Sequence, residues 1–254
     1  MAGKPKVAHF VARELMREIA ERGLVPGDHL AAEHELISRL GVSRGSAREG
    51  LRLLESFGVI ELRRGAGGGA IISKPEPQIL AAPLAMMLQF EGASLGTVLE
   101  AVNAIEPTVA ALAAERRSPE QLAQLADCVQ SLKTSATDDL TFRVANRRFH
   151  DLLAEASGNA LLGILMPCLS WMSMSIGWYL PPAHRQRVAD EKASILEAVV
   201  RQDSSAAYER TRAMLVGAEE LRSGNPEAFD APVVWVHLSE LLEAYLNAPT
   251  TSRI

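Results

Sequence analysis

The chain has 254 residues, of which 48% are hydrophobic and 22% are charged, a composition typical of a globular protein with more than one domain. Its two cysteines, Cys128 and Cys168, have no ligand-like spacing, which argues against a disulfide framework or a cysteine metal site. No apolar run approaches the ~20 residues that span a bilayer, and the first residues lack the apolar core of a signal peptide. We therefore expect a cytoplasmic protein with no membrane partner.

Charge divides the chain into two parts. Residues 1–74 carry 12 lysines and arginines against 9 aspartates and glutamates, whereas the remainder carries 14 against 22, which gives the net charge of −5. A basic module joined to an acidic one confines any contacts with nucleic-acid phosphates to the first part.

The first part begins with three predicted helices. Apolar residues one turn apart predict an amphipathic helix over Lys6–Arg22. A short helix over Glu33–Leu40 stops at Gly41, and Ser43 is a good N-cap for a third helix that runs to about Phe57. A helix, a tight turn with glycine and a second helix form the helix-turn-helix arrangement.

The third helix carries a basic face. Arg44, Arg48 and Arg52 recur every four residues, on a different face from the apolar residues of the same helix. A guanidinium can bond to guanine O6 and N7 or bridge phosphates, and the first turn of a recognition helix lies deepest in the major groove. We expect Arg44, Ser46 and Arg48 to contact bases and Arg52 to contact the DNA backbone.

A solvated charged face is the alternative for this helix, with Arg48 paired to Glu49 or Glu55. The segment that follows favours the DNA-binding interpretation, because two short strands flank a glycine-rich tip that carries Arg63 and Arg64. A phosphate-binding loop would need a helix after it, whereas this loop precedes a strand. The segment is therefore predicted to be the basic wing of a winged helix-turn-helix. Its strands are expected at Val59–Leu62 and Ala70–Ile72.

The segment Leu30–Ile72 resembles the winged helix of GntR-type regulators without a gap. It reads LAAEHELISRLGVSRGSAREGLRLLESFGVIELRRGAGGGAII, against a family pattern close to L-P-S-E-R-E-L-A, then L-G-V-S-R-x-x-V-R-E-A-L and a basic, glycine-rich wing. Ala32 stands where the family often has a serine cap, and His34 stands where it usually has an arginine, which removes a permanent positive charge. The resemblance implies that Arg44 and Arg48 read bases and backbone, supported by Ser43, Ser46, Arg63, Arg64 and Gly65; Arg52 and His34 complete the expected DNA-binding residues.

The second part of the chain is predicted to be all helical. The break at Pro75-Glu76-Pro77 separates a DNA-binding domain at 1–74 from an effector-binding and dimerisation domain at 84–254, with 75–83 as a linker. The fold class is therefore mainly α, with a small β-hairpin wing and a C-terminal helical bundle large enough to enclose a cavity. Apolar stripes predict helices over Leu95–Arg116, Leu122–Leu132, Asp138–Ala156, Asn159–Gly177, Ala183–Arg201, Ser205–Leu221 and Pro232–Leu246.

Residues Leu80–Arg222 resemble, more loosely, the FCD effector domain of FadR-type GntR regulators. The pieces that carry the likeness are Ile105-Glu106-Pro107, Arg148–Asn159 and Ile195–Ala198. The resemblance implies a homodimer, more often a repressor, that responds to a small molecule. A dimer would place two recognition helices about 34 Å apart and so read a palindromic operator on double-stranded DNA.

Many FCD domains hold a divalent metal with an aspartate and three histidines, and most of those positions differ here. Asn146 stands at the aspartate position and His150 at the first histidine, whereas Lys192 and Met214 stand at the two later histidines. One imidazole with an amide, an ammonium and a thioether is a poor Zn²⁺ site. We expect no metal and no other cofactor. Asn103 replaces an arginine that the family tends to have near the pocket.

These same positions are the expected lining of the effector pocket, namely His150, Asn146, Lys192, Met214 and Asn103. Lys192 is a candidate anchor for a carboxylate or phosphate. Trp171–Met174 and Trp178-Tyr179 concentrate aromatic and thioether surface, which suits an apolar or aromatic effector. The alternative for these residues is plain core or dimer interface.

Three functions remain open from the sequence. The first is a DNA-binding regulator controlled by an effector, and the second is a regulator whose bundle only dimerises because side chains fill the pocket. The third is an enzyme, suggested by Asp151 and Glu155 after His150. No activated nucleophile accompanies these residues, so we expect no catalytic residues and no enzyme.

Overall fold

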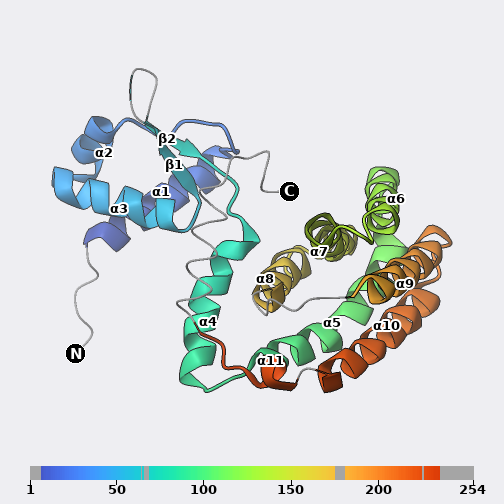
Figure 1. Cartoon of the computed structure of the whole chain (residues 1–254). Coiled ribbons are helices and arrows are strands. Elements are labelled where there is room, and N and C mark those ends of the chain that lie inside the picture. Colours follow the sequence, from blue (N-terminus) through green and yellow to red (C-terminus); the bar gives the residue numbers. More distant parts are fainter. Residues whose placement is uncertain (1–6, 64, 66–68, 175–180, 225, 235–254) are drawn as a thin grey trace. The chain divides into compact units, whose positions relative to one another are not determined.

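The computed structural model describes residues 7–63, 65, 69–174, 181–224 and 226–234 (Figure 1). The chain divides into two compact units, Met1–Ile79 and Leu80–Ile254. The predicted mainly α fold class, with one small antiparallel hairpin after the N-terminal helices, is confirmed. The segment 75–83, predicted as a linker, contains a 3-10 helix, η1 (Pro77–Leu80), and the start of a helix that was not predicted, α4 (Ala81–Phe90).

The first unit is a three-helix module with a hairpin. Its helices are α1 (Val7–Arg22), α2 (Glu33–Leu40) and α3 (Arg44–Ser56), and its strands are β1 (Ile60–Arg63) and β2 (Gly69–Ile72). The strands pair antiparallel, with Ile60 opposite Ile72 and Arg63 opposite Gly69. Figure 1 shows the hairpin following α3 and lying beside it. The winged helix-turn-helix predicted from the sequence is therefore present.

The turn between α2 and α3 is set by one glycine and one serine. Gly41 has a φ of 62°, a left-handed conformation that favours glycine, and its N–H donates to the Ile37 carbonyl at 3.0 Å. Two residues later the Ser43 Oγ accepts the N–H of Ser46 at 3.2 Å and caps α3. The sharp stop and the immediate restart fix the angle between the two helices.

The core of the first unit comes from the apolar stripe of each helix and from the inner face of the hairpin. Leu15 of α1 and Leu36 of α2 are completely buried. Gly50 of α3 lies against Val11 of α1, where any side-chain carbon would collide with it. The remaining members of this cluster are Val11, Ala12, Leu30, Leu51, Leu54, Ile60, Ala70 and Ile72.

Glu18 joins α1 to α2 through a buried carboxylate. It accepts hydrogen bonds from Arg39 of α2 and from Arg22 one turn along α1, the latter at 2.5 Å. The hydrogen bond from Arg39 is the main cause that lowers the pKa of Glu18, against the opposing effect of burial. The negative charge is therefore part of what holds the two helices together.

Glu18→Gln is expected to lower the free energy of unfolding at neutral pH by about 1–3 kcal/mol, because charge-assisted hydrogen bonds to two guanidinium groups are lost. A lowered pKa in the folded state gives stability that is present above the unfolded value of 4.5 and is lost as the pH falls through the folded value. Urea unfolding of both proteins measures this, and the difference between them should shrink in acid. Glu14→Gln, which removes a more exposed partner of Arg17, serves as the control and should cost under ~1 kcal/mol. An equal loss in both variants would contradict the role given to Glu18.

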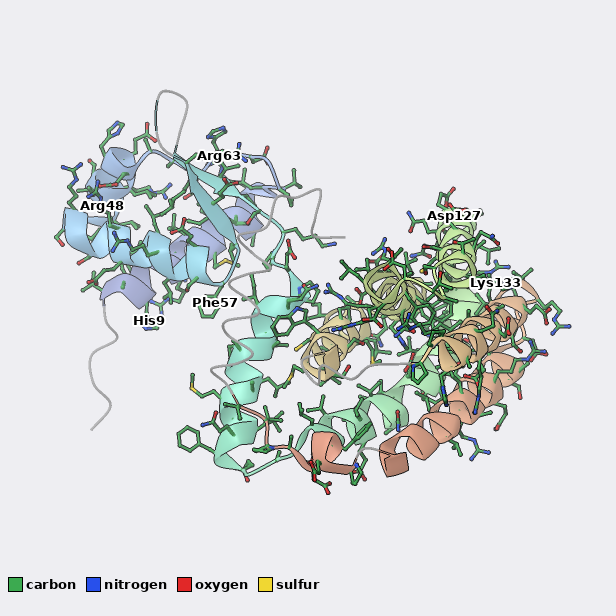
Figure 2. The ribbon with its side chains drawn as sticks, in the orientation of Figure 1. His9, Arg48, Phe57, Arg63, Asp127 and Lys133 are labelled. Carbon is green, nitrogen blue, oxygen red and sulfur yellow. The ribbon has the colours of Figure 1, made fainter. Side chains whose placement is uncertain are left out.

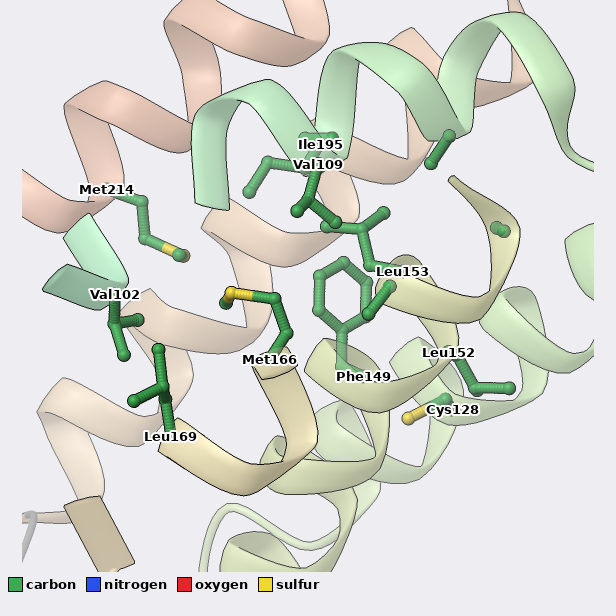
Figure 3. Packing of buried hydrophobic residues seen from close by; sticks show 14 of the residues in the cluster. Val102, Val109, Cys128, Phe149, Leu152, Leu153, Met166, Leu169, Ile195 and Met214 are labelled. Atoms are coloured by element: carbon green, nitrogen blue, oxygen red, sulfur yellow. The ribbon is translucent and has the colours of Figure 1, made fainter. Parts of the chain in front are cut away.

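The second unit is a helical bundle built around α5. Its helices after α4 are α5 (Leu95–Arg116), α6 (Pro119–Thr134), α7 (Asp139–Ala156), α8 (Leu162–Met174), α9 (Pro182–Val200), α10 (Ser204–Gly224) and α11 (Pro226–Asp230). Helix α5 contacts α7, α8, α9 and α10, and α6 lies against α7 and α9. Figure 3 shows how side chains from these helices meet in one core, with Phe149, Leu153, Met166 and Ile195 among them.

Helix α5 is both long and apolar. Among the described residues it is the one helix whose length and composition would allow it to cross a bilayer. It is also the central helix of the bundle, and residues such as Val98, Val109 and Ala113 are buried by its neighbours. The buried central helix of a helical bundle can be equally long and apolar, so this composition is weak evidence for a membrane span.

The predicted helix over Pro232–Leu246 is wrong at its start. Pro232 forms an isolated antiparallel bridge with Ser94, flanked by hydrogen bonds from the Leu95 N–H to the Ala231 carbonyl and from the Val233 N–H to the Ala93 carbonyl, each of 3.0 Å. These extended contacts satisfy the backbone groups that a helix would have used. The rest of that predicted helix, from residue 235 on, and the end of the one predicted over Asn159–Gly177 lie outside the described residues.

Candidate functional sites

The arginines on the basic face of α3 are exposed, and two of them form ion pairs with the same acidic residue. The side chains of Arg44 and Arg48 are 73% and 56% exposed, and both point to Glu33 at the first turn of α2. The Arg44 Nε donates to one Glu33 oxygen at 3.1 Å, and the Arg48 Nε donates to both oxygens at 3.1 Å. Burial opposes ionisation of Glu33, but the hydrogen bonds from Arg48 and Arg44 outweigh it and lower the pKa of Glu33. One carboxylate thus orients two guanidinium groups.

The alternative pairing of Arg48 with Glu49 or Glu55 is therefore incorrect. The Glu55 Oε1 instead accepts the N–H of Leu62 at 3.2 Å, which ties the end of α3 to β1. Arg48 reaches back to the preceding helix because the turn at Gly41 brings the start of α2 beside the first turns of α3.

A groove of about 450 Å³ lies between α3 and the hairpin. Three basic side chains line it, Arg48 and Arg52 from α3 and Arg63 from β1. Figure 2 labels Arg48 and Arg63 on these two elements of the unit. Two acidic residues, Glu33 and Glu55, also line it and are hydrogen-bonded as described above. The remaining lining residues are Ala31, Ala32, Leu51, Leu62, Gly69 and Ala70. The groove therefore has arginines on both of its sides.

The other residues that were expected to bind DNA differ in their exposure and in their hydrogen-bond partners. The Ser43 hydroxyl caps α3, and its oxygen lies 3.0 Å from that of Ser46. His34 is exposed on α2, and Arg63 pairs with Glu61 at 2.9 Å. Gly65 has a φ of 99° at the hairpin tip, a conformation that side chains rarely adopt. Arg64 lies outside the described residues.

The second unit contains a buried cluster of three ionisable side chains from three helices. His150 of α7 lies between Glu106 of α5 and Lys192 of α9. Its Nδ1 is hydrogen-bonded to the Glu106 Oε1, and its Nε2 lies 2.8 Å from the Lys192 Nζ. Glu106 and Lys192 are each 1% exposed, so the bulk solvent screens this cluster very little. The ring of Phe149 lies against it, with the Lys192 Nζ 4.4 Å from the ring centroid.

The charges of this cluster are determined by burial and by mutual contact. Burial lowers the pKa of Lys192 to about 8, and the Glu106 carboxylate opposes that shift. Burial would raise the pKa of Glu106, but the charge and hydrogen bond of His150 and the charge of Lys192 outweigh it and lower that pKa. Glu106 is therefore held as a carboxylate beside the two nitrogen-bearing side chains.

The structure brings together only part of the expected pocket. His150 and Lys192 form a hydrogen-bonded pair, whereas no hydrogen bond or ion pair joins Asn146, Met214 or Asn103 to them among the described residues. Asn146 precedes His150 by one helical turn, and its buried Oδ1 lacks a hydrogen-bond partner. Met214 is 8% exposed and belongs to the hydrophobic core (Figure 3). Asn103 is half-buried, one turn before Glu106 on α5.

Two residues of this cluster, Glu106 and Phe149, were absent from the expected lining. A carboxylate inside the apolar stripe of a buried helix needs a buried partner, and that is the signal that would have identified Glu106. Nothing in the sequence singled out Phe149, because an aromatic side chain on the apolar face of a helix usually belongs to the hydrophobic core.

The aromatic and acidic candidates of the second unit have structural partners. Trp171 and Met172 are buried within the hydrophobic core, while Trp178 and Tyr179 lie outside the described residues. Asp151 pairs with Arg147 at 3.5 Å, and Glu155 pairs with Arg148 at 3.5 Å. Each acidic side chain after His150 therefore forms an ion pair with an arginine of the same helix.

Comparison with known proteins gives matches over both units. The model of "Bacterial regulatory proteins, gntR family" matches residues 7–68, and that of the FCD domain matches residues 97–217. The chain is 31% identical over 220 residues to the "Putative L-lactate dehydrogenase operon regulatory protein" of Escherichia coli (strain K12), covering 83% of this chain and 84% of that protein. It is 25% identical over 209 residues to the "Galactonate operon transcriptional repressor" of the same organism, covering 80% of this chain and 91% of that one. A solved GntR structure from Streptococcus agalactiae shares the fold, with a TM-score of 0.66 and 24% identity over 84% of this chain and 99% of that chain.

Proposed function

The chain belongs to the gntR family of bacterial regulatory proteins and carries an FCD domain, and from this membership we propose that two copies of it bind a palindromic operator and release it when a small molecule binds. The family establishes the coarser function. The chain is a DNA-binding transcription regulator with an effector-binding domain, and it is not an enzyme. The dimer, the palindrome and the roles of individual residues belong to the proposal.

The groove between α3 and the hairpin is the observation that carries the DNA-binding part. Arg44, Ser46 and Arg48 at the start of α3 contact base edges in the major groove, because the first turn of such a helix lies deepest there. Arg52 and Arg63 contact phosphates from the two sides of the groove. The surface is completed by Ser43, His34, Arg64 and Gly65.

Regulation follows from coupling between two domains. We assign residues 1–74 to DNA binding and residues 84–254 to effector binding and dimerisation. An effector that prefers one arrangement of the dimer changes the spacing of its two α3 helices. Because coupling between sites is reciprocal, DNA then lowers the affinity for that effector by the same factor.

Two further features of the proposal rest on the relatives. The galactonate operon relative is named a repressor, which supports repression as the mode of action of this chain. A regulator that binds chromosomal DNA acts in the cytoplasm of a bacterium, and that is where we place it.

Gel-shift titration against the chain's own upstream region tests the proposal. We expect one complex that contains two copies of the chain and that is lost when either half of a palindrome is scrambled. An effector candidate should dissociate this complex at a fixed protein concentration. A complex with one copy, or one indifferent to the palindrome, would contradict the dimeric mode of binding. A palindrome-dependent complex that no small molecule affects would favour a bundle that only dimerises.

A further inference from the structure

Glu33 engages the same nitrogen of both arginines at the start of α3. The Nε atoms of Arg44 and Arg48 donate to its carboxylate at 3.1 Å, and these are the hydrogen bonds that the two guanidinium groups form among the described residues. A guanidinium carries five N–H donors in a rigid planar fork, one on Nε and four on the two terminal nitrogens. The terminal donors of both arginines are therefore left for DNA, and their direction is fixed from the other end by Glu33.

Arg52 provides a comparison within the same helix. It lies one turn beyond Arg48 on the same face and is exposed, yet it forms no hydrogen bond or ion pair with the residues that the structure describes. Its side chain is therefore free to follow a phosphate of any DNA. Because Glu33 belongs to α2, the difference between the two kinds of arginine is a product of the tertiary fold and not of the spacing along α3.

The carboxylate of Glu33 is a fixed negative charge inside the groove between α3 and the hairpin. Its side chain is 30% exposed and lines this groove together with Arg48, Arg52 and Arg63. The arginine hydrogen bonds lower the pKa of Glu33, so the group is ionised at neutral pH. It also lies in the first turn of α2, where the helix dipole favours a negative charge. A DNA phosphate that enters the groove therefore meets a carboxylate of the same sign.

This charge acts differently on the two ways in which a protein holds DNA. Binding to DNA of any sequence comes almost entirely from the neutralisation of phosphates, so a carboxylate among the arginines weakens it. Binding to an operator depends in addition on hydrogen bonds to the neutral acceptors of base edges, which require well-directed donors. Glu33 supplies that direction by holding Arg44 and Arg48 through Nε. One side chain thus disfavours unrelated DNA and favours the operator.

We propose that Glu33 is a specificity-determining residue of the DNA-binding surface, because it directs Arg44 and Arg48 at base edges and at the same time repels the phosphates of unrelated DNA. It acts through the two arginines and needs no contact with a base of its own, which makes it a positioning residue. The inference rests on the proposed function, since it presupposes that this groove binds an operator. Specificity is a difference between two affinities, and a repulsive group contributes to it as well as an attractive one.

Fluorescence anisotropy with a labelled operator and an unrelated duplex of equal length, each at several salt concentrations, tests this inference. Glu33→Gln keeps the shape of the side chain and removes its charge. We expect the affinity for the unrelated duplex to rise by ~3- to 10-fold, with a salt dependence steeper by about one phosphate contact. The ratio of operator affinity to unrelated affinity should fall by ~10-fold or more. A variant that fails to fold cannot bind unrelated DNA more tightly, so this readout separates positioning from a structural role.

Glu35→Gln is the matched control, because it removes the same charge from the same turn of α2. The Glu35 carboxylate accepts the Ala32 N–H at 3.3 Å and forms no hydrogen bond or ion pair with α3 among the described residues. Glutamine can keep that capping contact, so the affinity ratio should stay as in the wild type. Glu33→Asp is the second variant, which keeps the charge but shortens the side chain. It should bind unrelated DNA as the wild type does and the operator more weakly.

An unchanged affinity ratio in Glu33→Gln would overturn the inference, and so would an equal fall of the ratio in Glu33→Gln and Glu35→Gln. If Glu33→Gln does not fold, Glu33→Asp decides, and equal losses of operator and unrelated affinity in that variant would overturn the inference. These results leave the proposed function intact when the wild-type protein prefers a palindromic operator. A wild-type protein that binds operator and unrelated duplex alike would instead contradict the proposed function.

Discussion

Arg48→Ala is expected to lower operator affinity by roughly 10- to 100-fold, because a guanidinium that makes a bidentate contact with a base contributes about 1–3 kcal/mol. Its Nε is held by both oxygens of Glu33, so the other edge of the guanidinium faces away from the protein before DNA arrives. Such orientation in advance reduces the side-chain entropy lost on binding. The loss should therefore lie at the upper end of this range. Fluorescence anisotropy with a labelled operator at fixed salt measures it.

Two further arginine variants distinguish base contacts from phosphate contacts. Arg52→Ala should weaken operator and unrelated DNA alike and reduce the dependence of affinity on salt, as expected for the loss of one phosphate contact. Arg48→Ala should weaken the operator more than unrelated DNA. Arg17→Ala on α1, which removes the same charge from an exposed position outside the groove, is the matched control. If Arg48→Ala and Arg17→Ala have equal effects, α3 is not the element that reads the bases.

Gly50→Ala is expected to destabilise the first unit by about 1–3 kcal/mol, although alanine is the better helix former. A Cβ built at this position would lie 2.5 Å from the Val11 Cγ1 and 2.6 Å from the Val11 Cβ. The Val11 Cβ is attached to the backbone, so a rotamer change cannot remove the overlap, and α1 must move away from α3. Both helices belong to the same small core, and the strain spreads through it.

The same substitution five residues earlier is the control. Gly45 lies on the exposed part of α3, and a Cβ there would meet nothing closer than the Ser43 Oγ at 3.8 Å. Gly45→Ala should therefore raise the free energy of unfolding by up to ~1 kcal/mol through helix propensity alone. Thermal and urea unfolding followed by circular dichroism compare the two variants. Stabilisation by both substitutions would contradict the close packing of α1 on α3.

The first unit was predictable because its signals are local. Helical periodicity, the glycine stop at Gly41 and the serine cap at Ser43 lie within a few residues of the structures they specify. The basic face of α3 followed from a four-residue repeat. The partner of that face did not, because Glu33 belongs to another helix and reaches Arg48 only after the turn has folded. Sequence spacing along α3 pointed instead to Glu49 and Glu55.

The second unit was predictable in its helices but less so in its chemistry. Glu106, His150 and Lys192 come from three helices, and no local pattern connects them. Helix α4 was missed because the segment Ala81–Phe90 is apolar on all sides and shows no amphipathic period. At Pro232 the apolar period indicated a helix, but pairing with Ser94 provides the backbone hydrogen bonds in another way.

The bridge between Ser94 and Pro232 has a consequence for biosynthesis. It joins the start of the central helix of the bundle to a segment beyond α11, and Val233 beside it is completely buried. The second unit therefore cannot complete its core until the segment that contains Val233 has been translated. The hydrophobic core of the first unit ends in β2, so all of its residues have been translated far earlier. Since domains fold as units from the N-terminus during synthesis, each nascent polypeptide acquires its DNA-binding module while the remaining bundle is still being made.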